Sequence, residues 1–217
     1  MWTEYRSRDG ESISESGICR HRRNRSFLLW KYGGGPELPW KDWVEQFCKG
    51  YEHAKEEGDK IGLQVFFGWE SGYHGTEFLI YGLNKEWLLE HPEIKDADVK
   101  EQYELVHAGG GIVSHAHPFR EEDYIPEIRL FPDCVDAVEG INATHESPAS
   151  TSHKNILYNE KAIAYAKEHG LPITAGSDQH TTRMIGGGML FDRKLSDEKR
   201  FLQGSACRGG KSILERQ

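Results

Sequence analysis

The sequence predicts an α/β fold in which short buried strands alternate with helices. Three observations predict it. In some segments apolar residues recur at three- and four-residue steps, which is typical of amphipathic helices. Between them lie short apolar, β-branched and aromatic runs, which are typical of buried strands. Acidic residues and histidines follow several of these runs. This alternation favours a parallel sheet or barrel with helices outside, in which functional residues gather at the carboxyl ends of the strands.

The expected elements follow one another along the chain. The first helix is predicted from apolar periodicity, and the second is stopped by the glycines at 109–111. The strands are predicted from short apolar runs. The segments are helix 37–58, strands 61–67 and 78–83, helix 99–108, strands 112–114 and 135–139, helix 155–169 and strand 173–175.

Composition indicates one globular domain. The 217 residues are 37% hydrophobic and 29% charged, and no apolar run reaches the ~18 residues that a membrane span needs. Residues 1–8 lack the apolar core of a secretory signal, so we expect a cytoplasmic protein without a membrane partner. The cysteines form no CxxC pair, which argues against a zinc ribbon and a disulfide scaffold; they are Cys19, Cys48, Cys134 and Cys207.

Charge divides the chain into two unlike parts. Residues 1–31 hold seven Lys and Arg against four Asp and Glu, a charge of +3, so the total of -8 leaves -11 for the remainder. We therefore predict an atypical basic segment at 1–31 and one domain at 32–217. The acidic body makes nucleic acid an improbable partner, because it repels phosphate.

Acidic and histidine side chains follow three of the predicted strands. They are Glu70, the pair His115 and His117, and the pair Asp178 and His180. In extended chain the two residues of a His-x-His or Asp-x-His pair point to the same face. Carboxylate oxygen and imidazole nitrogen are ligands for divalent cations, so a barrel rim would gather a metal site here. The alternative for each pair is structural, such as a buried histidine pair or a helix cap.

Several motifs in this order resemble the PHP (polymerase and histidinol phosphatase) family of metal-dependent phosphoesterases. The similarity spans roughly 33–188, and Val138-Glu139 with Asn142 is similar to a further segment of the family. The main motifs are Gly68-Trp69-Glu70, Glu77-Phe78-Leu79-Ile80-Tyr81-Gly82, Ser114-His115-Ala116-His117-Pro118-Phe119-Arg120 and Ala175-Gly176-Ser177-Asp178-Gln179-His180.

The resemblance implies a distorted (β/α)7 barrel that holds up to three divalent metal ions, Mn, Zn or Fe. It implies that Glu70 bridges two metals and that His117, Asp178 and His180 complete the cluster. Glu77 stands where the family usually has a histidine, and it can still ligate through oxygen. His74, three residues earlier, competes for the same role.

The resemblance also implies hydrolysis of a small phosphorylated substrate, a phosphomonoester or a nucleotide. Arg120 is the candidate phosphate clamp, because its planar guanidinium fits phosphate oxygens. Arg183 is a second candidate, and either arginine could instead be a solvated surface residue. His115 is expected beside the metal ligands or the substrate.

The beginning of the family pattern is missing from this sequence. Relatives open with His-x-His and then Thr-Asp-His, whereas His21 lies in a basic run that would repel a cation. We therefore expect a barrel that is incomplete at its N-terminus. Shifting the frame by one base over 18–27 permits an apolar strand that ends in Thr-Asp-His, so a frameshift is one hypothesis. The alternatives are a degenerate, non-catalytic metal-binding or interaction domain and a nucleic-acid-binding arm at 20–25.

Overall fold

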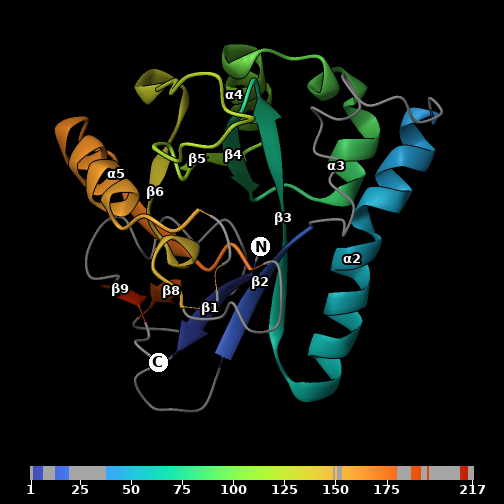
Figure 1. The fold of residues 1–217 in the computed structure, drawn as a ribbon. Coiled ribbons are helices and arrows are strands. Elements are labelled where there is room, and N and C mark those ends of the chain that lie inside the picture. Colours follow the sequence, from blue (N-terminus) through green and yellow to red (C-terminus); the bar gives the residue numbers. More distant parts are fainter. Residues whose placement is uncertain are drawn as a thin grey trace.

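A computed structural model of the chain describes residues 38–148, 150, 153–179, 187–191 and 195, with the backbone of strands at 2–6, 13–19 and 211–214. The described strands form one sheet in the order β7-β6-β5-β4-β3-β2-β1-β8-β9 (Figure 1). Their bounds are β1 Trp2–Arg6, β2 Ile13–Cys19, β3 Gln64–Tyr73, β4 Thr76–Tyr81, β5 Ile112–Ala116, β6 Ala137–Asn142, β7 Ile173–Gly176, β8 Gly187–Leu190 and β9 Lys211–Leu214.

The sheet is mixed, and this corrects the expectation of a parallel sheet. Parallel pairing joins β2 to β3, β5 to β6 and β6 to β7, but β4 runs antiparallel to both of its neighbours. The physical reason lies in the connection of β3 to β4. His74 and Gly75 form a two-residue turn with φ of 49° and 88°. Positive φ at both positions is what a tight hairpin turn requires, so the chain reverses directly.

The same hairpin lengthens β3 beyond its predicted end. The sequence predicts a strand that stops before Glu70, whereas the structure continues it to Tyr73 because every residue from Gly68 onward pairs with β4. Glu70 therefore lies within a strand and not after one. The remaining predicted strands are confirmed, and their ends shift by at most three residues.

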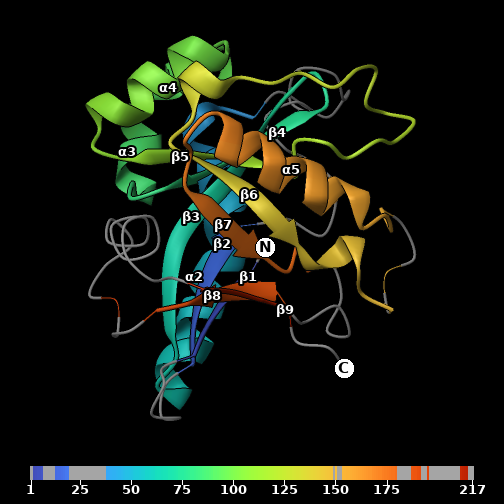
Figure 2. The ribbon, with the colours of Figure 1, turned by 90° about the vertical axis from the view of Figure 1, so that its left-hand side faces the viewer.

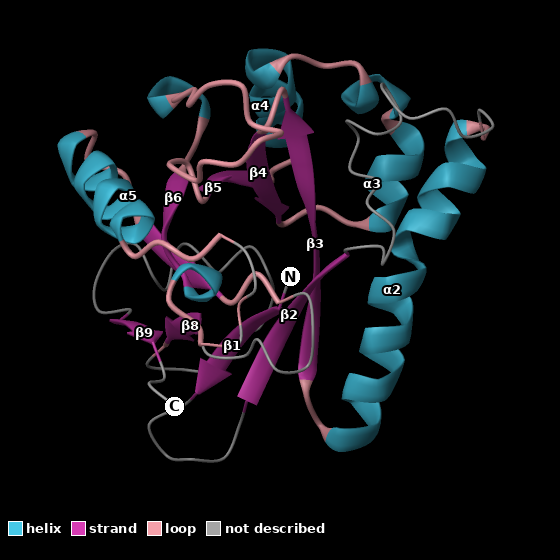
Figure 3. Ribbon diagram, in the orientation of Figure 1, coloured by secondary structure: helices cyan, strands magenta, loops and turns pink. Residues whose placement is uncertain are grey.

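Helices lie around the outside of the curled sheet (Figure 3). The longest described helix, α2, continues past Gly58 because Gly62 is the glycine with a left-handed φ (73°), and its N–H bonds Gly58 O. Figure 1 places α2 and α3 beside β3, and Figure 2 shows α5 over β6. The helices are α2 Trp40–Ile61, α3 Lys85–Glu90, α4 Val99–Ala108 and α5 Leu157–Glu168, and 3-10 turns cover Pro92–Lys95, Pro132–Cys134 and Ala143–His145.

Apolar side chains form separate layers on the two faces of the sheet. The outer layer joins α2, α3 and α4 to the sheet through residues such as Val44, Phe47, Trp69, Phe78 and Leu88. A second layer lies on the opposite face and contains Leu79, Tyr81, Ala116, Ala137, Ala175 and Met189. Burial of this apolar surface is the main force that holds the helices on the sheet.

The sheet curls until distant strands approach each other. β7 and β8 lie far apart in the strand order, yet a Cβ added at Gly187 would lie 2.2 Å from the carbonyl oxygen of Gly176. The fold is therefore a mixed α/β half-barrel, and the complete seven-stranded barrel stays a prediction. Within the described residues, every helix is too short or too polar to cross a membrane.

Candidate metal centre

Glu70 and Glu77 lie on adjacent strands and face the same side of the sheet. Glu70 on β3 pairs with Leu79 on β4, and Glu77 on β4 pairs with Ala116 on β5. Paired residues share a face, and so do alternate residues of a strand. Both carboxylates therefore project from the face that carries Leu79 and Ala116. The register brings together two acids that are seven positions apart in sequence.

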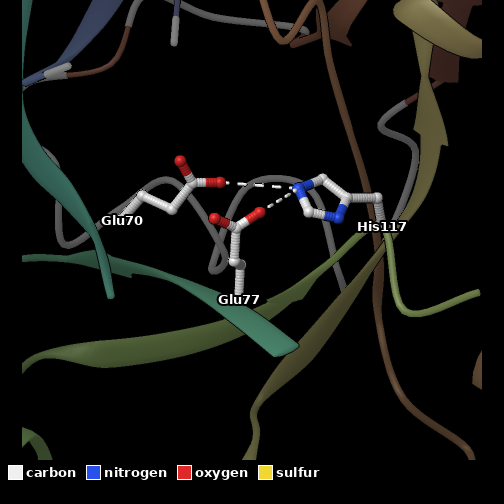
Figure 4. A group of neighbouring side chains, drawn as sticks. All are labelled: Glu70, Glu77 and His117. Carbon is white, nitrogen blue, oxygen red and sulfur yellow. Dashed lines mark ion pairs between the residues drawn. The ribbon is translucent and has the colours of Figure 1, made fainter. Parts of the chain in front are cut away.

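His117 completes a group of three metal-type donors (Figure 4). Its Nε2 lies 3.2 Å from Oε2 of Glu77 and 3.5 Å from Oε1 of Glu70. The three ligand atoms lie within 4.8 Å of one another, and this is the one such group within the described residues. Glu70 and His117 are 6% and 5% exposed. The structure thus brings together three of the five metal ligands that the sequence predicts.

The backbone of His117 leaves the extended path of β5. Its φ is 26°, its N–H donates to Oε2 of Glu139 (3.1 Å), and its carbonyl accepts from the N–H of Arg120 (3.0 Å). This turn rotates the imidazole toward Glu70 and Glu77. His115 stays in the strand, where it pairs with Phe78 and its ring stacks on that phenyl at 5.1 Å.

The two histidines of the His-x-His motif consequently lie on opposite faces, so the expectation of a shared face was wrong for this pair. Residues in a regular strand would obey it, but the positive φ of His117 interrupts the alternation. His115 is fully buried between Phe78 and Tyr165, away from the carboxylates. Its expected role beside the metal ligands or the substrate stays a prediction.

The imidazole of His117 is neutral at neutral pH. Its pKa falls from 6.5 to about 4, because burial and then the Arg120 charge oppose protonation more than Glu70 favours it. Its Nε2 is buried and makes no hydrogen bond to the described residues, although both carboxylates are near. A neutral ring nitrogen that faces two carboxylates is the donor arrangement of a divalent cation site.

Asp178 lies in a second, adjoining network. It follows β7 with φ of 46°, is completely buried, and forms an ion pair with the guanidinium of Arg120. Nδ2 of Asn142 donates both to Oδ2 of Asp178 (3.2 Å) and to Oε2 of Glu139 (3.0 Å). The predicted ligand Asp178 and the predicted phosphate clamp Arg120 are therefore partners of each other.

Glu139 and His145 are buried members of this region, and sequence reasoning gave neither a specific role. The pKa of Glu139 rises from 4.5 to about 8, because burial and the Asp178 charge outweigh the hydrogen bond from Asn142. The pKa of His145 falls from 6.5 to about 3, through burial and then Arg120. Glu139 could have been found by its place near the end of a predicted strand. His145 gave no signal, because a 3-10 turn positions it.

Of the remaining candidate residues, the structure describes only His74. His74, the competitor of Glu77, occupies the hairpin turn and is outside the donor group. His180 and Arg183 fall outside the described residues. A small cleft adjoins the donor group and is lined by Glu77, His117, Arg120, Ile125, Ile128 and Arg129.

Fold and donor set together define the class: an α/β chain with an acid and histidine pocket of the kind that binds divalent cations. The family model PHP_C, described as PHP-associated, matches residues 157–205, less than a quarter of the chain. This match supports a PHP-domain family for the chain. A search of curated proteins finds no match.

Two solved structures are similar to the chain. One is a two-domain protein from Bacteroides vulgatus that contains a predicted PHP-like metal-dependent phosphoesterase, with 16% identity and a TM-score of 0.44 over 61% of this chain and 37% of that one. The chain thus spans little more than a third of that protein. The other is a candidate metal-dependent phosphoesterase from Bifidobacterium adolescentis, with 15% identity and a TM-score of 0.42 over 80% of this chain and 92% of that one.

Proposed function

We propose that the chain is a metal-dependent phosphoesterase that hydrolyses the phosphate ester of a small phosphomonoester or nucleotide. The observation that carries the proposal is the convergence of Glu70 on β3, Glu77 on β4 and His117 just after β5 into one largely buried group. The PHP-associated family match supports the same general kind of protein.

The donor group fits a divalent cation by its chemistry. Two carboxylates and a neutral imidazole suit Mn²⁺, Zn²⁺ or Fe²⁺, and the extra carboxylate at Glu77 favours Mn²⁺ or Fe²⁺ over Zn²⁺. The buried Nε2 of His117, with no hydrogen bond among the described residues, is the kind of atom that a cation would satisfy. A cation held there would polarise a phosphate oxygen and lower the pKa of a water molecule.

The residues around the donor group would position it and the substrate. Glu139 holds the backbone of His117, which fixes the direction of the imidazole. Arg120 lines the adjoining cleft, and its buried Nε makes no hydrogen bond to the described residues. We assign Arg120 to the substrate phosphate, whose oxygens a guanidinium binds well. The small cleft and the charge of -8 favour a small substrate over a polyanion.

A phosphatase assay with p-nitrophenyl phosphate tests the proposal. The rate is measured with Mn²⁺, Zn²⁺ or Fe²⁺ and with a chelator, for the wild-type chain and for the double variant His117→Ala/Asp178→Ala. We expect a metal-dependent rate, small in the chain as written, that the double variant loses. The control is His169→Ala, which removes an exposed histidine at the end of α5. A rate that survives chelation or the double substitution contradicts the assignment.

A metal-binding domain without catalysis is the second candidate. The observation that favours it is the ion pair between Arg120 and Asp178, which occupies a residue expected to hold metal. Tight binding of Mn²⁺ without any metal-dependent phosphatase rate would select this alternative.

A further inference from the structure

Arg120 carries a positive charge into the interior of the protein. Its side chain is 2% exposed, and it contacts the fully buried carboxylate of Asp178. Burial alone lowers the pKa of the guanidinium, but the Asp178 and Glu77 charges outweigh it and raise the pKa above its ordinary value. Arginine therefore stays cationic here at every accessible pH. A permanent cation is built into the candidate site.

Residue types that usually bind metals surround this guanidinium. Asp178 contacts it directly, and Asn142 joins Asp178 to Glu139. Oε1 of Glu139 and Nε2 of His145 are buried and make no hydrogen bond to the described residues. Nδ1 of His145 lies 2.8 Å from Oδ1 of Asn159, which also accepts from the N–H of Asn142, so His145 belongs to the same network. The arginine thus occupies a place with the chemistry of a cation site.

The ligand atoms at Asp178 have different partners from those in the group of Glu70, Glu77 and His117. In the latter group, two carboxylates point at a ring nitrogen. At Asp178, Oδ2 already accepts from the guanidinium of Arg120 and from Nδ2 of Asn142. A divalent ion at Asp178 would compete with the guanidinium for the same oxygen and would be repelled by its charge. Within the described residues, the first site fits a metal ion and the second does not.

We propose that Arg120 is the built-in cation of Asp178 and takes the place of a second metal ion, so that the pocket holds one divalent cation at Glu70, Glu77 and His117. The inference rests on the proposed metal site. It deepens the proposed function, because stabilising charge around a bound phosphate would come from one ion and one guanidinium.

Counting bound Mn²⁺ tests the inference. Isothermal titration with Mn²⁺ alone is carried out on the wild-type chain and on Arg120→Gln, Arg120→Lys and the double variant Arg120→Gln/Asp178→Asn. We expect Arg120→Gln to bind one more equivalent than the wild type, because it frees the Asp178 carboxylate. Arg120→Lys keeps a cation, and the double variant removes the carboxylate, so both should bind as many equivalents as the wild type. In His117→Ala the wild-type equivalent should be lost.

Melting temperature gives an independent readout. Arg120→Gln leaves a buried carboxylate without its cation, so we expect a lower melting temperature in chelator. Mn²⁺ should raise the melting temperature of this variant more than that of the wild type or the double variant, because the variant binds one more ion. Equal Mn²⁺ counts for wild type and Arg120→Gln would overturn the inference. So would an Arg120→Gln chain that stays unfolded in Mn²⁺ while the double variant folds. A wild-type chain that binds no Mn²⁺ would overturn both the inference and the proposed function.

Discussion

The backbone N–H of His117 donates a hydrogen bond of 3.1 Å to Oε2 of Glu139, which lies on the neighbouring strand β6. Because both residues are buried, the bond fixes the turn that directs the imidazole toward Glu70 and Glu77. Glu139 is thus expected to act on a metal ion through His117.

The first prediction follows from that bond. Glu139→Ala removes the acceptor, and we expect the affinity for Mn²⁺ to fall by about 10–100-fold, as is typical for groups that orient a metal ligand. Titration calorimetry measures the change. Glu104→Ala, which removes an exposed carboxylate on α4, is the matched control. Equal affinities of Glu139→Ala and the control would show that His117 keeps its orientation without Glu139.

The second prediction concerns the turn between β3 and β4. Gly75 has φ of 88°, and an added Cβ would lie 3.1 Å from Cα of Ile125. Gly62 has a similar φ of 73° but has no neighbour within 4 Å of such a Cβ. We expect Gly62→Ala to cost about 1 kcal/mol of unfolding free energy, from the left-handed backbone alone.

Gly75→Ala should lower the free energy of unfolding by more than Gly62→Ala, because it adds the contact with Ile125 to the same backbone strain. It should also weaken Mn²⁺ binding, since the turn sets the position of Glu77. Urea unfolding and calorimetry measure the two effects. A smaller loss of stability in Gly75→Ala than in Gly62→Ala would contradict this account of the hairpin.

The third prediction is a loss of stability in mild acid that depends on His145. Its pKa is about 3 in the folded chain against 6.5 ordinarily, so the unfolded chain binds more protons between these values. The stabilising contribution is complete above pH 6.5 and falls as the pH decreases toward 3. The slope for one such group is at most about 1.4 kcal/mol per pH unit.

His145→Asn should therefore reduce the fall in unfolding free energy between pH 7.5 and 5.5, measured with urea. Tyr158→Phe is the control, because it alters the ring packed against His145 without removing the imidazole. We expect the control to retain the wild-type slope. A slope that is the same in all three proteins would exclude His145 as its source.

The fourth prediction concerns the first 31 residues. We expect little phosphatase activity from the chain as written, because the His-x-His and Thr-Asp-His motifs of the family are not in it. If the gene read one base forward over 18–27 encodes Thr-Asp-His, a version restored in that frame should bind more metal, melt at a higher temperature and hydrolyse phosphate faster. A stop codon in that frame would remove the frameshift hypothesis, and equal rates would show that these motifs are dispensable.

Much of the fold could be predicted from local patterns. Helix α4 agrees with its predicted bounds, and the ends of α2 and α5 lie within three residues of their predicted positions. The sequence could not show that β4 runs antiparallel, because apolar runs look alike in either direction. That direction depends on two positive φ values in a turn.

The candidate site likewise has features that the sequence predicts and features that only the tertiary structure sets. The sequence by itself determined that Glu70, Glu77 and His117 are donors near the ends of buried segments, since residue type and strand position are local properties. Only the tertiary structure decided that they meet, that His115 faces the other side, and that Arg120 pairs with Asp178. Those outcomes depend on strand register, on the positive φ of His117 and on a buried ion pair whose two residues are 58 positions apart in sequence. A local sequence pattern encodes none of these.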